Sequence, residues 1–334
     1  MDGGTSLLGP LAKPTRHIDR LAAPIFVSWQ LTRDCDLACI HCCTESAPGK
    51  AMQGEFSREE ALAFADELIA ADVPYVMLCG GEPMIVPHFL EVAERLGGAG
   101  VQLKIETNGQ RFGLEEVERL AELPMRSVQI SLDADTQEVY ARQRPGASLA
   151  KVHAACQAVR AAGLPLEVTF APTCVNIEEL PAVLRRARAL GAFRFNTGAL
   201  MRIGNAAKNW RKLTPSDVQY ERFRATLDHE AAAGRGEMEL CYSPFRMVDG
   251  LRQLLDEPPA TLLVLPNGWV KASAALPYIV AELRHCSLLE AWHNYRRAWQ
   301  TPLLMDALHR AIADEAEHAA ANSWQKLEPA VCNA

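Results

Sequence analysis

The spacing of apolar residues alternates between two periods from about residue 25 to residue 200. Short runs of β-branched and apolar residues predict buried strands, and stretches with apolar residues three or four positions apart predict helices. The expected strands are Ile25–Leu31, Tyr75–Cys79, Val101–Glu106, Ser127–Leu132, Leu166–Ala171 and Arg194–Thr197. The expected helices are Arg58–Ala71, Pro87–Gly97, Leu114–Leu123, Leu149–Ala162 and Ile177–Leu190, with Ser57 and Asn176 as N-caps. This alternation predicts parallel β/α units.

Six such units in succession predict an α/β fold, a partial (β/α)6 barrel of the TIM type. Residues 1–24 are rich in Gly, Pro and small side chains and are expected to form an extension. The barrel is expected over residues 25–210. Barrel enzymes carry their catalytic residues on the loops after the strands, so unusual residues in these loops are candidate functional residues.

Residues 211–334 follow a different pattern and are expected to form a small α+β appendage. A helix is expected from Pro215 to Ala233, opened by Thr214, and then a strand over Gly236–Tyr242. Two apolar arms around Asn267-Gly268 predict a hairpin over Leu262–Ala272, because this dipeptide favours tight turns. The helices expected to close the chain are Leu288–Gln300 and Leu303–Ala320.

Composition narrows the functional classes. The 334 residues are 49% hydrophobic and carry a formal net charge of −7, without a dense basic run, which argues against nucleic-acid binding. No apolar run is long enough to cross a bilayer, and Asp2 stands where a signal peptide carries positive charge. We therefore expect a cytoplasmic protein that binds neither nucleic acid nor membranes.

Three of the ten cysteines, Cys35, Cys39 and Cys42, fall in the loop after the first expected strand. Disulfides are rare in the cytoplasm, so the spacing indicates metal or redox chemistry. Thiolates suit zinc or iron–sulfur clusters, but structural zinc usually takes four ligands in two separated pairs. Three thiolates in one loop favour a [4Fe–4S] cluster with one open iron. The alternatives are inert thiols, or zinc with Cys43 or His41 as the fourth ligand.

Further motifs follow the later strands in order. They are CGGEP at Cys79–Pro83, ETNG at Glu106–Gly109, SLD at Ser131–Asp133 and RQRPG at Arg142–Gly146. Together with the cysteine spacing they resemble the radical S-adenosylmethionine (SAM) superfamily, over roughly residues 25–200. Each motif alone is an ordinary turn sequence, and their joint register with the β/α period carries the resemblance.

The resemblance implies the site residues position by position. Cys35, Cys39 and Cys42 are expected to bind a [4Fe–4S] cluster whose fourth iron is chelated by SAM. The expected SAM contacts are His41 near the adenine, Gly80, Gly81 and Glu82 at the amino group, Asn108, Ser131 and Asp133 at the ribose or methionyl group, and Arg144 at the carboxylate. The alternative for Asp133 and Arg144 is a surface ion pair.

The resemblance also implies the reaction type. A reduced cluster cleaves SAM to methionine and a 5′-deoxyadenosyl radical, which takes a hydrogen atom from a substrate carbon. The electron is expected to come from a flavodoxin or ferredoxin. Cys241, at the end of an expected strand, is a candidate hydrogen-atom donor, with a buried structural thiol as the alternative.

Residues 265–294 resemble the SPASM or Twitch region of some relatives. Pro266-Asn267-Gly268, Val270 and Leu289–Trp292 match, whereas Lys271–Ala274 replaces the cysteine position and only Cys332 follows near the end. We therefore expect the fold of this appendage without its auxiliary clusters. The sequence as a whole resembles the mycofactocin and pyrroloquinoline-quinone peptide maturases, which rely on such clusters.

The leading hypothesis is therefore a single-cluster radical SAM enzyme of natural-product or antibiotic biosynthesis. Its expected substrate is a small polar molecule such as a sugar, a nucleoside or an aminoglycoside-like compound. Its expected reaction is redox-neutral: epimerisation, dehydration, decarboxylation or radical addition. The first alternative is a ribosomal-peptide maturase that has lost its auxiliary clusters, and the second is a non-enzymatic iron–sulfur or zinc scaffold.

Overall fold

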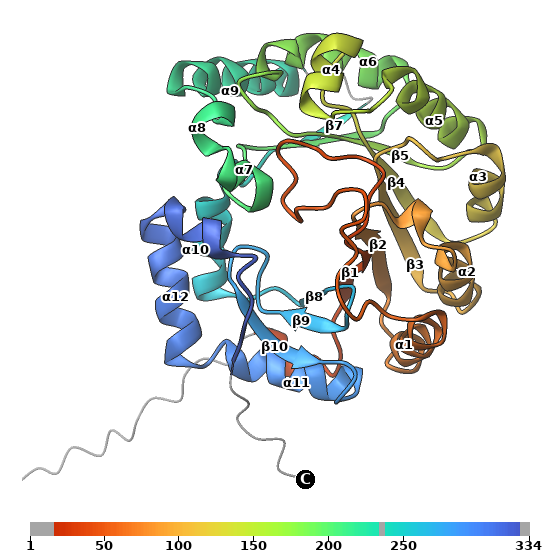
Figure 1. Ribbon diagram of the computed structural model, residues 1–334, viewed down its shortest axis with the longest axis vertical. Helices are drawn as coiled ribbons and strands as arrows, with labels where there is room; N and C mark the ends of the chain where they lie inside the picture. Colours follow the sequence, from red (N-terminus) through yellow and green to blue (C-terminus); the bar gives the residue numbers. More distant parts are fainter. Residues whose placement is uncertain (1–16, 234–237, 328–334) are drawn as a thin grey trace, which may run out of the picture.

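The computed structural model describes residues 17–233 and 238–327. Six parallel strands lie side by side in chain order: β1 (Phe26–Thr32), β2 (Tyr75–Gly80), β3 (Gln102–Thr107), β4 (Met125–Ser131), β5 (Leu166–Phe170) and β6 (Arg194–Thr197). The helices α1 (Arg58–Ala70), α2 (Phe89–Gly98), α3 (Leu114–Ala121), α5 (Leu149–Ala161) and α6 (Leu180–Ala189) cover the outer side of the curved sheet (Figure 1). The predicted partial barrel is therefore confirmed.

The sheet continues beyond both edges of these six strands and contains eleven strands in all among the described residues. On one edge, β7 (Glu239–Cys241) pairs in parallel with β6. On the other edge, β8 (Thr261–Val264) pairs in parallel with β1, and β9 (Trp269–Lys271), β10 (Tyr278–Glu282) and β11 (Gln325–Lys326) follow outward. The predicted hairpin is confirmed as β8 and β9. A division of the chain at residue 210 stays a prediction, since strands from both sides of it share the sheet.

The remaining helices complete the architecture. They are α4 (Gln137–Gln143), α7 (Gly204–Lys208), α8 (Trp210–Leu213), α9 (Asp217–Ala232), α10 (Met247–Asp256), α11 (Leu288–Ala298) and α12 (Pro302–Ala313). Short 3-10 turns cover His17–Arg20, Pro83–Ile85, Ile177–Glu179 and Glu315–Ala320. The sequence pattern did not predict α4, α7, α8 or α10. No helix of the described chain combines the length and apolar character needed to cross a bilayer.

Three local predictions were wrong in part, for identifiable reasons. Asn176 takes the N-cap position of the 3-10 turn Ile177–Glu179, but its side chain makes no capping hydrogen bond. Its side-chain oxygen accepts from the Thr173 N–H at 2.7 Å and its amide donates to the Asp133 carbonyl at 2.8 Å. The helix expected from Pro215 begins at Asp217, because Ser216 forms the capping box. The helix expected over Leu303–Ala320 is interrupted after Ala313, where Asp314 caps a separate 3-10 turn.

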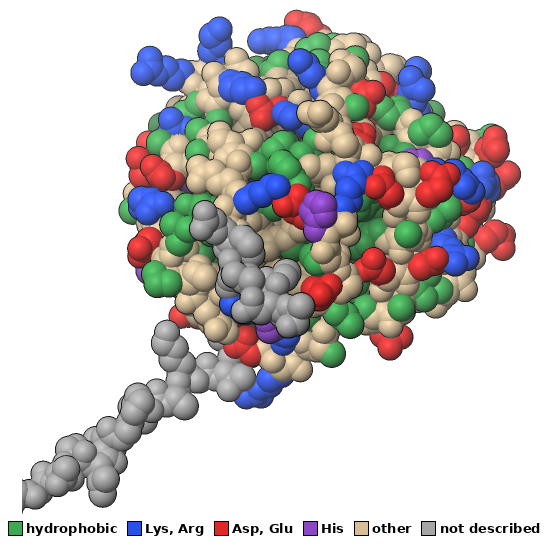
Figure 2. Space-filling model, turned by 60° about the horizontal axis from the view of Figure 1, so that its bottom comes forward, with side chains coloured by type: hydrophobic (Ala, Val, Ile, Leu, Met, Phe, Trp, Pro, Cys, Tyr) green, Lys and Arg blue, Asp and Glu red, His purple; other side chains and the backbone are tan. Residues whose placement is uncertain are grey.

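The two faces of the sheet differ in polarity. Residues such as Val76, Leu103 and Val168 are fully buried under the outer helices. Alternate positions face the inside of the curve and are polar, so that Glu167 accepts hydrogen bonds from Lys104 and from Asn196, both at 2.8 Å. On the molecular surface shown in Figure 2, basic and acidic side chains are interspersed. The side chains that the sheet directs to the inside of the barrel are therefore polar, whereas those directed to the outer helices are apolar.

Candidate active site

The cysteine motif lies on a long loop after β1, over residues 33–57, which folds inside the curve of the sheet (Figure 1). Helix α7 holds this loop in place. The Asn205 backbone N–H donates to the Cys42 carbonyl at 2.9 Å, and the Asn205 amide donates to the Cys39 carbonyl at 3.1 Å. A Cβ on Gly204 would lie 2.5 Å from the Cys43 carbonyl oxygen, so this close approach requires glycine.

Each of the three motif cysteines has polar hydrogens directed at its sulfur. Cys35 Sγ accepts from the Leu37 N–H at 3.4 Å and from Asn108 Nδ2 at 3.7 Å. Cys39 Sγ accepts from Arg144 Nη1 at 3.4 Å, and Cys42 Sγ accepts from the Ser46 N–H at 3.4 Å. Such donors stabilise a thiolate bound to iron, and they tune the cluster that it holds. The residues present therefore fit an iron–sulfur cluster.

Burial shapes the protonation of these thiols before any metal binds. It raises the pKa of Cys35 to about 12 and that of Cys39 to about 11. Metal binding must therefore displace a proton from each sulfur.

The mononuclear zinc alternative finds no support in the arrangement. Among the described residues, no three His, Cys, Asp or Glu side chains converge as a single ion would require. His41 Nε2 instead lies 3.5 Å from Asp133 Oδ2, and Cys43 lines a pocket on the side of the β8–β9 hairpin. The two residues considered as a fourth zinc ligand are thus directed elsewhere.

The CGGEP loop after β2 packs against the start of the cysteine loop. The Gly81 N–H donates to the Thr32 carbonyl at 2.7 Å, and a Cβ on Gly81 would lie 1.9 Å from the Asp34 carbonyl oxygen. Gly80 has a φ of +134°, which L side chains rarely adopt. The glycines thus bring two protein loops together. Their predicted contact with SAM stays a prediction.

Glu82 is fully buried beneath these loops. Its carboxylate accepts from Thr107 Oγ1 at 2.7 Å, from the Asn108 N–H at 2.8 Å and from the Met84 N–H at 3.2 Å. Burial raises the pKa of Glu82 to about 7. Glu82 therefore joins the β2 and β3 loops, a structural role that the sequence did not reveal beside its predicted role at the SAM amino group.

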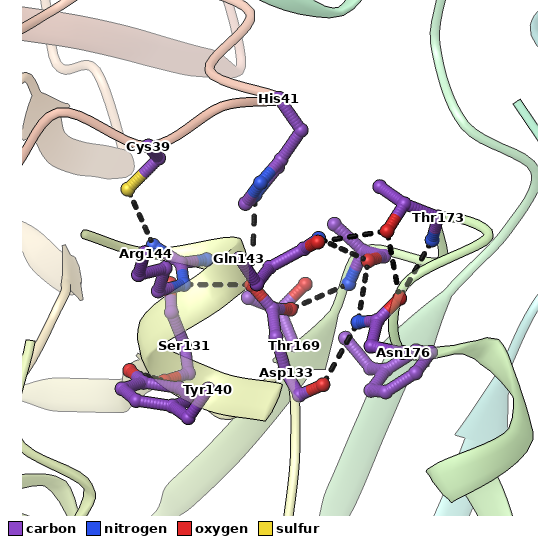
Figure 3. A network of polar contacts seen from close by, with 12 residues as sticks. Cys39, His41, Ser131, Asp133, Tyr140, Gln143, Arg144, Thr169, Thr173 and Asn176 are labelled. Carbon is purple, nitrogen blue, oxygen red and sulfur yellow. Dashed lines mark hydrogen bonds and ion pairs between the residues drawn. The ribbon is translucent and has the colours of Figure 1, made fainter. Parts of the chain in front are cut away.

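The loops after β4 and β5 meet in a buried polar network (Figure 3). Asp133 Oδ2 accepts from Arg144 Nε at 2.6 Å, and Asp133 Oδ1 accepts from the Ala171 N–H at 2.8 Å. Asp133 is 0% exposed and Arg144 8%, so they form an ion pair that is buried, not on the surface as the alternative supposed. Burial lowers the pKa of His41 to about 4, which keeps its ring neutral beside this pair.

The predicted cluster and SAM residues thus lie on the cysteine loop, at the ends of β2, β3 and β4, or in the segments that follow these strands. Cys35 contacts a donor from the β3 loop and Cys39 one from the segment after β4, whereas the donor to Cys42 belongs to the cysteine loop itself. Arg144 also links Asp133 to Cys39. Residues 29–187 match the family model of the radical SAM superfamily. The chain contains a radical SAM domain. The cofactors of such a domain are a [4Fe–4S] cluster and SAM.

Curated relatives of this radical SAM protein fall into more than one class. Over 200 residues it is 36% identical to mycofactocin maturase MftC of Mycobacterium ulcerans, covering 60% of this chain and 53% of the relative. Over 205 residues it is 31% identical to AdoMet-dependent heme synthase of Methanosarcina barkeri, covering 60% of this chain and 56% of the relative. The chain thus spans little more than half the length of either relative.

A solved structure shares the fold. The crystal structure of Streptococcus suis SuiB bound to S-adenosylmethionine superposes with a TM-score of 0.68 at 14% identity. The match covers 89% of this chain and 76% of SuiB. It supports the radical SAM barrel together with the strands that follow it.

The remaining predicted residues lie at strand ends in this radical SAM fold. Ser131 ends β4, and its carbonyl accepts from the Tyr140 hydroxyl at 3.0 Å. Cys241 ends β7 beside Asn196 and is half-buried, so it shares the inner face of the sheet. Its role as a hydrogen-atom donor stays a prediction. Cys332 lies outside the described residues.

Some residues that hold the site loops in place were not predicted from the sequence. Gln143 and Thr173 join α4 to the β5 loop, with Thr173 Oγ1 donating to Gln143 Oε1 at 2.8 Å. Asn205 holds the cysteine loop through two backbone carbonyls. Thr173 and Asn205 lie outside the quoted motifs, and Gln143 lies within RQRPG but was given no role. In the sequence, a polar side chain that binds a distant group looks like any loop residue.

Proposed function

We propose that this chain is a radical SAM enzyme that modifies a ribosomally made peptide. The observation that carries the proposal is the set of three cysteines on one loop of a radical SAM domain, each with donors directed at its sulfur. Similarity to mycofactocin maturase MftC supports a peptide substrate over the small polar molecule expected from the sequence.

The chain's own residues have distinct roles in this proposal. Cys35, Cys39 and Cys42 would hold the cluster, and the Arg144 guanidinium would stabilise the Cys39 thiolate. His41 and Asp133 lie next to that guanidinium, where the SAM-binding residues are expected. When bound, the cluster and SAM supply a 5′-deoxyadenosyl radical that abstracts hydrogen from the substrate. The barrel would exclude water and hold the substrate carbon in reach.

A small-molecule substrate is the second candidate function. The similarity to AdoMet-dependent heme synthase favours it, although that relative is named for heme and not for a sugar or nucleoside. In either case we propose a flavodoxin or ferredoxin as the electron donor and the cytoplasm as the location. We also propose that the C-terminal region binds no auxiliary iron–sulfur cluster.

A reaction with the encoded peptide tests the proposal. The anaerobically reconstituted enzyme, with about four irons per chain, is mixed with SAM, dithionite and each short peptide that sequencing finds encoded next to its gene. We expect 5′-deoxyadenosine to form and the peptide mass to change in step with it. Cleavage of SAM with an unaltered peptide would reject the peptide substrate, and no cleavage of SAM would reject the enzyme.

A further inference from the structure

A small pocket of about 70 Å³, open to solvent, adjoins the cysteine loop on the side of the β8–β9 hairpin. Its wall includes Thr44, whose hydroxyl lies 3.2 Å from Cys42 Sγ. Much of the remaining wall is apolar, and this part includes Met52, Met201, Ile203 and Leu263. The pocket therefore joins the expected cluster to a space that suits an apolar group.

Lys271 lines this pocket from β9 and is 3% exposed. Its Nζ donates to the Ala321 carbonyl at 2.9 Å and to the Ala274 carbonyl at 3.2 Å. In the part of the chain that the structure describes, no carboxylate lies within ion-pair distance of this ammonium, whereas the half-buried Lys104 pairs with Glu167 at 2.8 Å. A buried cation without a counter-charge is costly, so the site favours a ligand that supplies one.

A second group in the same wall lacks an acceptor. The indole Nε1 of Trp324 is buried and has no hydrogen-bond partner among the described residues. The Arg33 guanidinium also lines the pocket, 5.6 Å from the Trp324 ring centre, although its own N–H groups donate to the Thr44 carbonyl and to Glu45. Among the described residues, the Trp324 indole N–H and the third N–H of the Lys271 ammonium therefore have no protein acceptor, which suits an anionic ligand.

We propose that this pocket binds the substrate through a carboxylate, held by the Lys271 ammonium and the Trp324 indole N–H, with an apolar group against the neighbouring wall. The inference rests on the proposed function, because it gives the substrate of that reaction a binding pocket. The carboxylate belongs to the C-terminus of a peptide or to an acidic side chain, and the chemistry of recognition is the same for both. Lys271 is thus a binding residue.

Binding of short peptides to the anaerobically reconstituted holoenzyme tests the pocket. Three probes are titrated by calorimetry: acetyl-Ala-Leu-Phe with a free carboxylate, the same peptide as its amide, and acetyl-Glu-Leu-Phe-amide. We expect at least one carboxylate probe to bind about tenfold to a hundredfold more tightly than acetyl-Ala-Leu-Phe-amide, the range for a charge-assisted hydrogen bond. Preference for the first probe identifies a C-terminus, and preference for the third identifies an acidic side chain.

Variants assign the preference to one residue. Lys271→Met keeps the length of the side chain without its charge and is expected to bind carboxylate and amide probes equally. Lys271→Gln serves in the same way if the Met variant folds poorly. Lys208→Met removes an exposed cation that pairs with Glu45 beside the pocket, and is expected to keep the full preference. Equal binding of all probes by the wild type, or an unchanged preference in both Lys271 variants, would overturn the inference.

Failure of this inference is distinguishable from failure of the proposed function. SAM cleavage without peptide is measured in the same preparations and is expected to change less than about twofold in the exposed control Lys208→Met. A wild type that cleaves SAM but has no carboxylate preference lacks the proposed pocket. A wild type that shows the preference but never cleaves SAM keeps the pocket and loses the proposed function.

Discussion

The two sides of the cysteine loop differ in whether their buried charged groups are paired within the protein. On the side of the β2–β5 loops, Asp133 pairs with Arg144 at 2.6 Å and Glu82 accepts three protein hydrogen bonds. On the side of the β8–β9 hairpin, the buried Lys271 has two carbonyl partners and, among the described residues, no carboxylate.

This difference distinguishes the side whose geometry the protein fixes by itself from the side that a ligand can complete. Where the protein supplies both partners of a buried interaction, the geometry is formed before any ligand arrives. Where a buried N–H has no acceptor among the described residues, as at the Trp324 indole and at the third N–H of Lys271, a ligand can supply the acceptor. The first side is thus suited to hold a cofactor in a fixed place, and the second to select a substrate.

The largest expected effect on stability comes from breaking the paired side. Asp133→Asn leaves the Arg144 guanidinium as an uncompensated buried charge, and such losses cost about 3–5 kcal/mol. Urea denaturation of the purified protein measures the change. Asp66→Asn, which removes one partner of the exposed ion pair with Arg95, is the matched control and is expected to have little effect. Equal stability of the two variants would show that the buried pair does not organise these loops.

A smaller loss is expected at Glu82. In Glu82→Gln an amide NH2 replaces one acceptor oxygen, so a buried donor meets protein donors at a cost of about 1–3 kcal/mol. The midpoint of urea unfolding is the measurement, and a parallel SAM titration reports the expected loss of SAM affinity. Glu91→Gln changes an exposed carboxylate paired with Arg58 and is the control. An unaffected midpoint would assign Glu82 to SAM alone.

The smallest predicted effect is a pH dependence on the unpaired side. Burial lowers the pKa of Lys271 to about 8, so the preference for carboxylate probes is complete below about pH 7 and declines as pH rises through 8. Burial raises the pKa of the facing Cys43 thiol to about 12, so this thiol does not titrate in this range. Above pH 8 the affinity should fall by up to about tenfold per pH unit. A preference that is constant to pH 10 contradicts this prediction.

The sequence predicted what local pattern determines. The strands β1–β6 and the helices around them have strong apolar periods, and the cysteine spacing marks the loop after β1. It did not predict α4, Gln137–Gln143, which is short and largely polar. It also did not place β8 beside β1, because that pairing joins Phe26 to Thr261 across most of the chain. Lys271 was noted only as a residue near a missing cysteine position, since sequence alone does not show that a lysine is buried.

The central claim is that Cys35, Cys39 and Cys42 hold the cluster at which SAM is cleaved. Comparison of Cys39→Ala with Cys174→Ala, an exposed thiol far from the motif in sequence, tests it most directly. After anaerobic reconstitution and reduction, formation of 5′-deoxyadenosine from SAM is measured in both variants. The account predicts that SAM cleavage is lost in Cys39→Ala and retained in Cys174→Ala. Cleavage of SAM by Cys39→Ala at the wild-type rate would contradict this claim.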